Sequence, residues 1–245
     1  MSKVSFKNGP APMEEAPAAV VEAPLAVVPA TSHAVAPYDP NGVSGELDRR
    51  DLNMPRLALV QSVGPMSELF KPGQIVLNKE TVLTDGEKPI TLSVINIRKS
   101  FVQNLPYTED GPAPKRVNTL DEVRAQGGTI EYAGDEPPSW IPVADALVLV
   151  ESETENPAFP FEHDGKCYAA ALWTLRKTSY TRAAKNIFTA TQFALKGKPL
   201  CVGKWTLSTK REKIGQNFVY VPILRQVGKF DESFVAWVKE MGLGA

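Results

Sequence analysis

The sequence predicts a mainly β fold of the α+β class, and three observations support this prediction. Several segments alternate apolar and polar residues with a period of two, which is typical of half-buried strands. Turn signals such as those at 71–73 (KPG) and 85–86 (DG) separate these segments. A long run of helical spacing occurs at 181–195, and the C-terminal end carries a shorter one. At 245 residues, the chain is long enough to bury a core without disulfide bonds.

The composition predicts two regions. Residues 1–48 are rich in Ala, Pro and Val with little periodicity, so we expect a disordered arm; an arm that docks on a neighbouring subunit is the alternative. Residues 49–245 form the predicted ordered domain. Within it, residues 105–142 are rich in Pro and Gly and carry acids, and we interpret this segment as an insertion.

Strand patterns dominate the first part of the ordered domain. An apolar segment at 55–61 predicts the first strand, and the segment 74–83 predicts the second. Regular alternation through 90–102 predicts a longer, half-buried strand. A short apolar segment at 144–150 predicts another strand after the insertion.

One short helix is predicted inside the insertion, at 120–126. Thr119 and Glu122 have the spacing of a capping box, in which each side chain hydrogen-bonds to the backbone of the other residue. Gly127 and Gly128 follow and end the helix.

The last third of the chain has the clearest pattern. The predicted elements are a strand at 166–178, a helix at 181–195, a strand at 199–209, a basic turn at 210–216, a strand at 217–224 and a short final helix marked by Phe234, Val235, Val238 and Met241.

The charge is distributed unevenly, although the net charge is only −1. Residues 166–229 contain 13 Lys and Arg and a single acid, Glu212, which gives +12. Residues 1–165 contain 13 Lys and Arg against 24 acids, which gives −11. A basic block inside a nearly neutral protein predicts a surface that binds a polyanion.

Binding of single strands without sequence preference needs cations along a groove and flat side chains on which bases stack. The basic block interleaves both kinds of residue. Aromatic residues on strands are also typical of a core, and single lysines are typical of a solvated face. The predicted nucleic-acid-binding residues are Trp173, Arg176, Lys177, Tyr180, Arg182, Lys185, Lys204, Trp205, Lys210, Arg211, Lys213, Phe218, Tyr220 and Arg225.

Three consecutive segments carry a resemblance: 203–209 (GKWTLST), the basic turn after it, and 217–222 (NFVYVP). They resemble phage-type single-stranded DNA-binding proteins with an OB fold. The resemblance implies an OB-like Greek-key β-barrel with one helix between strands, here with a long insertion and a C-terminal helix. It also implies that the run 210–213 lies on a hairpin loop beside the binding face. The chain departs from many members in ending at 240–245 (EMGLGA) without an acidic tail, which puts tail-mediated recruitment in doubt.

We therefore predict a protein that binds single-stranded DNA non-specifically and protects it during replication or recombination, without catalysis, cofactor or metal. Replication or recombination proteins are further candidate partners, and the chain is a candidate to form a homo-oligomer. We expect no interaction with a membrane. One alternative is a virion-associated or structural assembly protein with a basic contact face. Another is a metal-dependent nuclease that uses acids such as Glu151 or Asp164.

The remaining motifs point away from other classes. Cys167 and Cys201 lie far apart and predict free thiols rather than a disulfide framework. His33 and His163 lack the spaced partners of a metal site, and no phosphate-binding glycine loop occurs. The sequence contains neither a signal-peptide pattern nor an apolar run of about 18 residues. We expect a cytoplasmic location, in the host cytoplasm if the protein is viral.

Overall fold

The computed structural model describes residues 53–106 and 112–243, and all of these belong to one unit that spans Arg50–Ala245. The fold is mainly β, and its sheets are antiparallel. The predicted arm at 1–48 lies outside the described residues. Among the helices of the described residues, none is long and apolar enough to cross a membrane.

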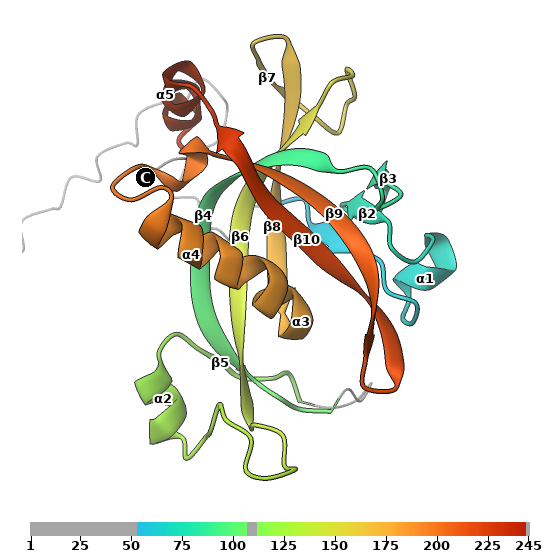
Figure 1. The fold of residues 1–245 in the computed structure, drawn as a ribbon, viewed down its shortest axis with the longest axis vertical. Helices are drawn as coiled ribbons and strands as arrows, with labels where there is room; N and C mark the ends of the chain where they lie inside the picture. The colour runs from blue at the N-terminus through green and yellow to red at the C-terminus, as the bar shows by residue number, and fades with distance from the viewer. Residues whose placement is uncertain (1–52, 107–111, 244–245) are drawn as a thin grey trace, which may run out of the picture. The chain divides into compact units, whose positions relative to one another are not determined.

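Five long strands form the main sheet (Figure 1). They are β4 (Ile90–Gln103), β6 (Trp140–Ser152), β8 (Lys166–Arg176), β9 (Gly203–Ile214) and β10 (Asn217–Lys229). Two short strands, β5 (Arg116–Val117) and β7 (Phe161–His163), pair with β4 and β8. The order is β10-β9-β4-β6-β8-β7, so in the described residues the pairing path is open rather than a closed ring.

A second, smaller sheet contains β1 (Leu57–Leu59), β2 (Ile75–Leu77) and β3 (Thr81–Thr84), with the short helix α1 (Met66–Leu69) after β1. Its first strand lies between two strands of the main sheet. On one side, Leu172 N of β8 donates to Pro55 O at 2.8 Å. On the other, the Gln61 side chain hydrogen-bonds to the backbone of Tyr220 in β10. The first strand therefore bridges the gap between β8 and β10.

The predicted strand at 74–83 is two strands. Asn78 and Lys79 have φ values of 53° and 60°, and this left-handed conformation reverses the chain between β2 and β3. Asn adopts the left-handed region more readily than most residues, so the sequence contained a local signal for this turn.

The helix predicted at 181–195 is confirmed, although it begins earlier. It consists of α3 (Lys177–Ser179), a π-helical turn η1 (Tyr180–Ala184) and α4 (Lys185–Phe193). The segment after it, where a strand was predicted from residue 199, first forms the 3₁₀ turn η2 (Leu200–Val202). The final helix is α5 (Glu232–Glu240).

One half of the capping box of the insertion helix is confirmed, and the Glu122 side chain bonds one residue before the N-cap. In α2 (Leu120–Ala125), Thr119 Oγ1 accepts from the backbone N–H of Glu122 at 3.2 Å. The Glu122 carboxylate accepts from the backbone N–H of Asn118 at 3.1 Å. Val123 of this helix is buried in a small apolar cluster with Phe101 and Trp140, which attaches the helix to the ends of β4 and β6.

The main core lies on one face of the main sheet. Alternate residues of β6 and β8, such as Val148 and Leu175, pack there against residues of β1, β2 and α4. Each fully buried Leu or Val of this kind stabilises the fold by about 1.5–3 kcal/mol. On the opposite face, Phe234 and Val238 of α5 cover Leu149, but they do not cover the part of that face around Asp145.

Candidate nucleic-acid interface

The β9–β10 hairpin carries most of the predicted site. The two strands pair along their whole length, from Gly203 opposite Lys229 to Ile214 opposite Asn217. The turn between them therefore contains only Gly215 and Gln216. Gly215 has a φ of 60°, which suits glycine in a two-residue hairpin turn. The prediction that 210–216 is a turn is therefore wrong for most of its length. Strand pairing continues through this run as far as Ile214 and Asn217.

The distal half of the hairpin leaves the main sheet. The pairing of β9 with β4 ends at Leu207, which is opposite Ile90. Beyond that point the two strands continue as a ribbon (Figure 1). The run 210–213 is consequently presented on an ordered ribbon and not on a loop.

One face of the ribbon combines cations with an exposed ring. The register places Arg211 opposite Tyr220 and Lys213 opposite Phe218, and paired residues of adjacent strands share a face. The guanidinium carbon of Arg211 lies 4.2 Å from the centroid of the Phe218 ring. The Phe218 residue is 51 % exposed. This face can therefore offer both a stacking ring and positive charge to a nucleic-acid strand.

The base of the ribbon is fixed to the small sheet. The Gln61 side chain donates to Tyr220 O at 2.8 Å and accepts from Tyr220 N at 3.0 Å. Thr209 Oγ1 donates to Gly73 O at 2.8 Å. The Tyr220 ring packs directly on Gly73, where a Cβ would lie only 2.6 Å from Tyr220 Cε1. Tyr220 is therefore half-buried and serves at least in part to seat the hairpin.

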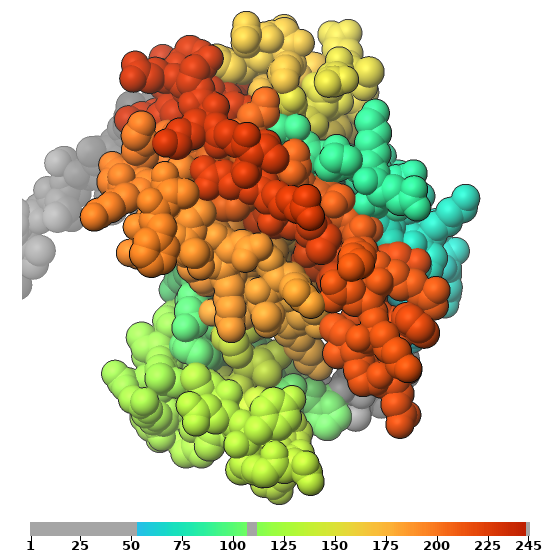
Figure 2. Space-filling model, in the orientation of Figure 1, coloured from blue at the N-terminus to red at the C-terminus, as the bar shows by residue number. Residues whose placement is uncertain are grey.

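Four predicted cations lie where β8 passes into the helix. Arg176 ends the strand, Lys177 follows with a φ of 48°, and both are exposed. Arg182 in the π-helical turn forms an ion pair with Glu212 of β9 at 2.7 Å, and Lys185 is exposed. The ion pair joins this group to the hairpin, and Figure 2 shows the helix and the hairpin as adjoining orange surfaces.

Most of these cations have no acidic partner among the described residues. Within residues 53–106 and 112–243, the following predicted residues form no ion pair: Arg176, Lys177, Lys185, Lys204, Lys210, Arg211, Lys213 and Arg225. The Arg182–Glu212 pair is partly exposed, and such pairs contribute at most about 1 kcal/mol to stability. The basic block therefore retains the positive field that attracts a polyanion.

Three of the predicted stacking residues are core residues. Trp173, Tyr180 and Trp205 are 4 %, 7 % and 1 % exposed. The two Trp residues alternate on the same strand faces as buried Leu175 and Leu207, so both rings enter the core. Burial also raises the pKa of the Tyr180 hydroxyl. In this conformation other side chains cover these three rings, so they offer no open face on which a base could stack.

Two predicted cations lie away from the hairpin tip. Lys204 is at the start of β9, where its Nζ lies 5.5 Å from the ring centroid of Phe230. Arg225 is exposed on β10 and is paired in register with Thr206. The cations at the hairpin tip and at the start of the helix therefore lie close together, whereas Lys204 lies at the opposite end of β9.

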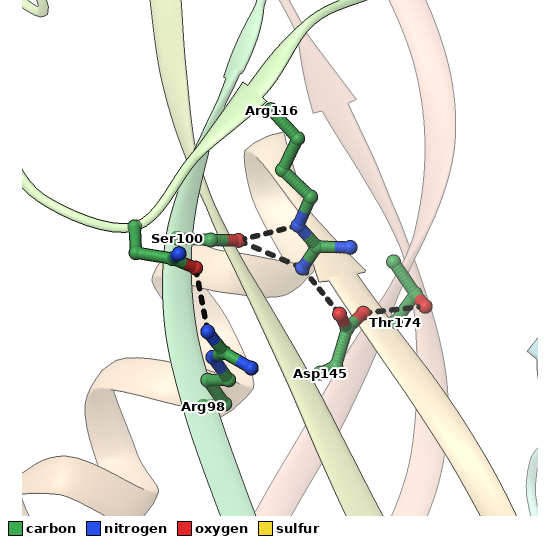
Figure 3. A network of polar contacts seen from close by, with 6 residues as sticks. Arg98, Ser100, Arg116, Asp145 and Thr174 are labelled. Atoms are coloured by element: carbon green, nitrogen blue, oxygen red, sulfur yellow. Dashed lines mark hydrogen bonds and ion pairs between the residues drawn. The ribbon is translucent and has the colours of Figure 1, made fainter. Parts of the chain in front are cut away.

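A polar cluster that the sequence reasoning missed lies on the uncovered part of the main sheet. Arg116 of β5 donates through Nε and Nη2 to Ser100 Oγ of β4, at 2.9 and 2.7 Å. Arg116 Nη2 also forms an ion pair with Asp145 of β6. Thr174 Oγ1 of β8 donates to Asp145 at 2.8 Å, and Arg98 donates to Asn118 at 2.8 Å (Figure 3). We call this part of the sheet the polar face.

Arg176 connects the polar face to the predicted site. It lies two residues after Thr174 on β8, and side chains two apart in a strand share a face. The sequence did contain signals for the cluster. The alternation through 90–102 places Arg98 and Ser100 on one side of the strand, and Asp145 is the one acid in the apolar segment 144–150.

One of the two acids named for a nuclease has another partner. Glu151 forms an ion pair with Lys166 at 2.5 Å. His163, which lies next to Asp164, stacks on Trp237 with ring centroids 4.8 Å apart. In the part of the chain that the structure describes, no three His, Cys, Asp or Glu side chains gather where they could hold a metal ion. Cys167 and Cys201 are both free.

No family model matches the chain, and neither a curated protein nor a solved structure matches it.

Proposed function

We propose that this protein binds single-stranded DNA without sequence specificity and protects it during replication or recombination. The hairpin tip and the start of the helix form the contact surface. The observation that carries the proposal is the half-exposed Phe218 ring beside Arg211, on an ordered ribbon flanked by cations without ion pairs among the described residues. The proposed activity is binding alone, without cleavage of the DNA.

The physical basis is a combination of two terms. Cations neutralise phosphates and release counterions, which favours binding of any strand and makes affinity fall with salt. A base stacked on an aromatic side chain adds about 1–3 kcal/mol, whichever base it is. Neither term reads a base edge, so the surface would be indifferent to sequence.

The arrangement of strands supports an OB-like Greek-key architecture, which is part of the proposal. The five long strands occur in the chain as β4, β6, β8, β9 and β10, with the helix between the third and the fourth. β4 pairs with both β6 and β9, and the last two strands form a hairpin. OB folds bind oligonucleotides on the face of strands two and three and on the loops beside it. Here that face corresponds to β6 and β8, where Asp145 and Arg176 lie.

Fluorescence-anisotropy titration of a labelled dT oligomer, at several salt concentrations and with duplex DNA as competitor, tests the proposal. We expect preferential single-strand binding that weakens with salt, with a slope of about −0.7 per neutralised phosphate. If neither DNA form binds at low salt, the proposal fails. The basic surface would then serve a protein partner, as in a virion-associated or structural assembly protein.

A further inference from the structure

The guanidinium of Arg116 is held in place by the main sheet. A guanidinium has five N–H donors. Three of those on Arg116 are directed at Ser100 and Asp145, and Thr174 in turn orients Asp145. The two N–H groups of Nη1 have no partner in the described residues, and in Figure 3 Nη1 points away from both holders. The Arg116 side chain is 41 % exposed, so this free end is accessible.

Two further cations lie on the polar face. Arg98 lies on the same side of β4 as Ser100, is exposed, and is itself held by Asn118 at 2.8 Å. Arg176 lies on the same side of β8 as Thr174. Three guanidinium groups therefore share the polar face with one carboxylate, that of Asp145, and the local charge is positive.

We propose that Arg116 is a preorganised contact for a backbone phosphate of single-stranded DNA, and that Asp145 is its positioning residue. This inference rests on the proposed function and extends the contact surface from the hairpin to the polar face. The two N–H groups of Nη1 that stay free can donate charge-assisted hydrogen bonds to phosphate oxygens. A side chain already held by three hydrogen bonds loses little conformational freedom when the strand binds.

The direction in which Asp145→Asn changes DNA affinity separates the positioning role of Asp145 from the effect of its negative charge. Asp145→Asn removes a negative charge from a surface that meets phosphates, so charge alone predicts tighter binding. Loss of the ion pair releases Arg116 and predicts weaker binding. The two effects have opposite signs, so the measured change in affinity decides between them.

The experiment uses the full chain and the labelled dT oligomer. We expect Asp145→Asn and Arg116→Gln each to weaken binding by about threefold or more. The double variant is expected to be no weaker than Arg116→Gln alone, since Asp145 acts through Arg116. Asp121→Asn is the matched control. It makes the same charge change at a carboxylate that pairs with Arg124 on α2, and it is expected not to weaken binding.

Ser100→Ala provides a second test without any charge change, should Asp145→Asn fail to fold. Ser100 is buried and accepts two of the Arg116 hydrogen bonds, so its loss is also expected to weaken binding. Tighter or unchanged binding by Asp145→Asn, or by Ser100→Ala if only that variant folds, overturns the inference while the proposed function stands. Absence of DNA binding by the unmodified protein overturns both.

Discussion

Phe218 and Trp205 lie on the same face of the same hairpin, yet their surroundings are opposite. Trp205 is 1 % exposed and packs in the main core, whereas Phe218 is 51 % exposed. The alternation of side chains is the same for both rings. The difference is that the core ends near Leu207, and the ribbon continues beyond it. At the residue scale, exposure follows from position along the hairpin.

Phe218→Ala tests the exposed ring. We expect the Kd for the dT oligomer to rise by about 5- to 150-fold, because one stacked base contributes about 1–3 kcal/mol. The free energy of unfolding should change little. Phe193→Ala is the control, since Phe193 is 81 % exposed at the end of α4, away from the hairpin tip. Equal effects of the two substitutions would contradict the assignment of Phe218.

Trp205→Ala tests the buried ring. We expect the free energy of unfolding, measured by urea denaturation, to fall by about 3–5 kcal/mol, because a large cavity forms in the core. The DNA affinity of the folded fraction should be retained. A variant with normal stability and lost affinity would show that Trp205 does contact the strand.

At the scale of elements, α5 begins with a side chain that both caps it and titrates. Asp231 accepts from the backbone N–H of Phe234 at 2.9 Å and from the Ser233 hydroxyl at 2.7 Å. These hydrogen bonds, that of Phe234 above all, lower the pKa of the Asp231 carboxyl below its ordinary value of 3.8. The charged carboxylate therefore stabilises the folded chain. This contribution is complete above the ordinary pKa and is lost as the pH falls through the lower, folded-state pKa.

Asp231→Asn tests this linkage by keeping a good N-cap acceptor while removing the titration. We expect the Tm of the unmodified protein to fall more steeply than that of the variant as the pH drops below 3.8. Thermal unfolding at a series of acidic pH values measures both curves. Parallel curves would mean that Asp231 does not contribute to the acid sensitivity.

At the scale of the whole molecule, a nearly neutral chain keeps a strongly basic segment. The net charge is −1, while residues 166–229 carry +12. Folding places the start of the helix beside the hairpin, where the only acid of that segment, Glu212, pairs with Arg182. The other cations around it keep a net positive charge. Salt dependence is therefore the property that reports on the surface as a whole.

Lys210→Gln combined with Lys213→Gln tests the surface charge. We expect the slope of log K against log salt concentration to become shallower by about 1.4, which corresponds to two lost phosphate contacts. Lys229→Gln combined with Lys239→Gln makes the same charge change at the other end of the hairpin and on α5. If both pairs change the slope equally, the charge acts without regard to place and the hairpin is not the contact surface.

The sequence by itself determined the local elements and the charge. The capping box of Thr119 and Glu122, the helix at 181–195 and the alternation through 90–102 depend on residues a few positions apart, where period and hydrogen bonding are local properties. The basic segment is also plain in the sequence. These signals were sufficient for a mainly β fold with three of its helices correctly placed.

Only the tertiary structure decided which of these residues face solvent. Trp173 and Trp205 were buried, and the hairpin was extended, by the pairing of strands that are distant in the chain and by the point at which the core ends. The cluster of Arg116 and Asp145 likewise brings together β4, β5, β6 and β8. Alternation assigns a residue to one side of a strand, but the partners that cover that side are set by long-range packing, which no short segment encodes.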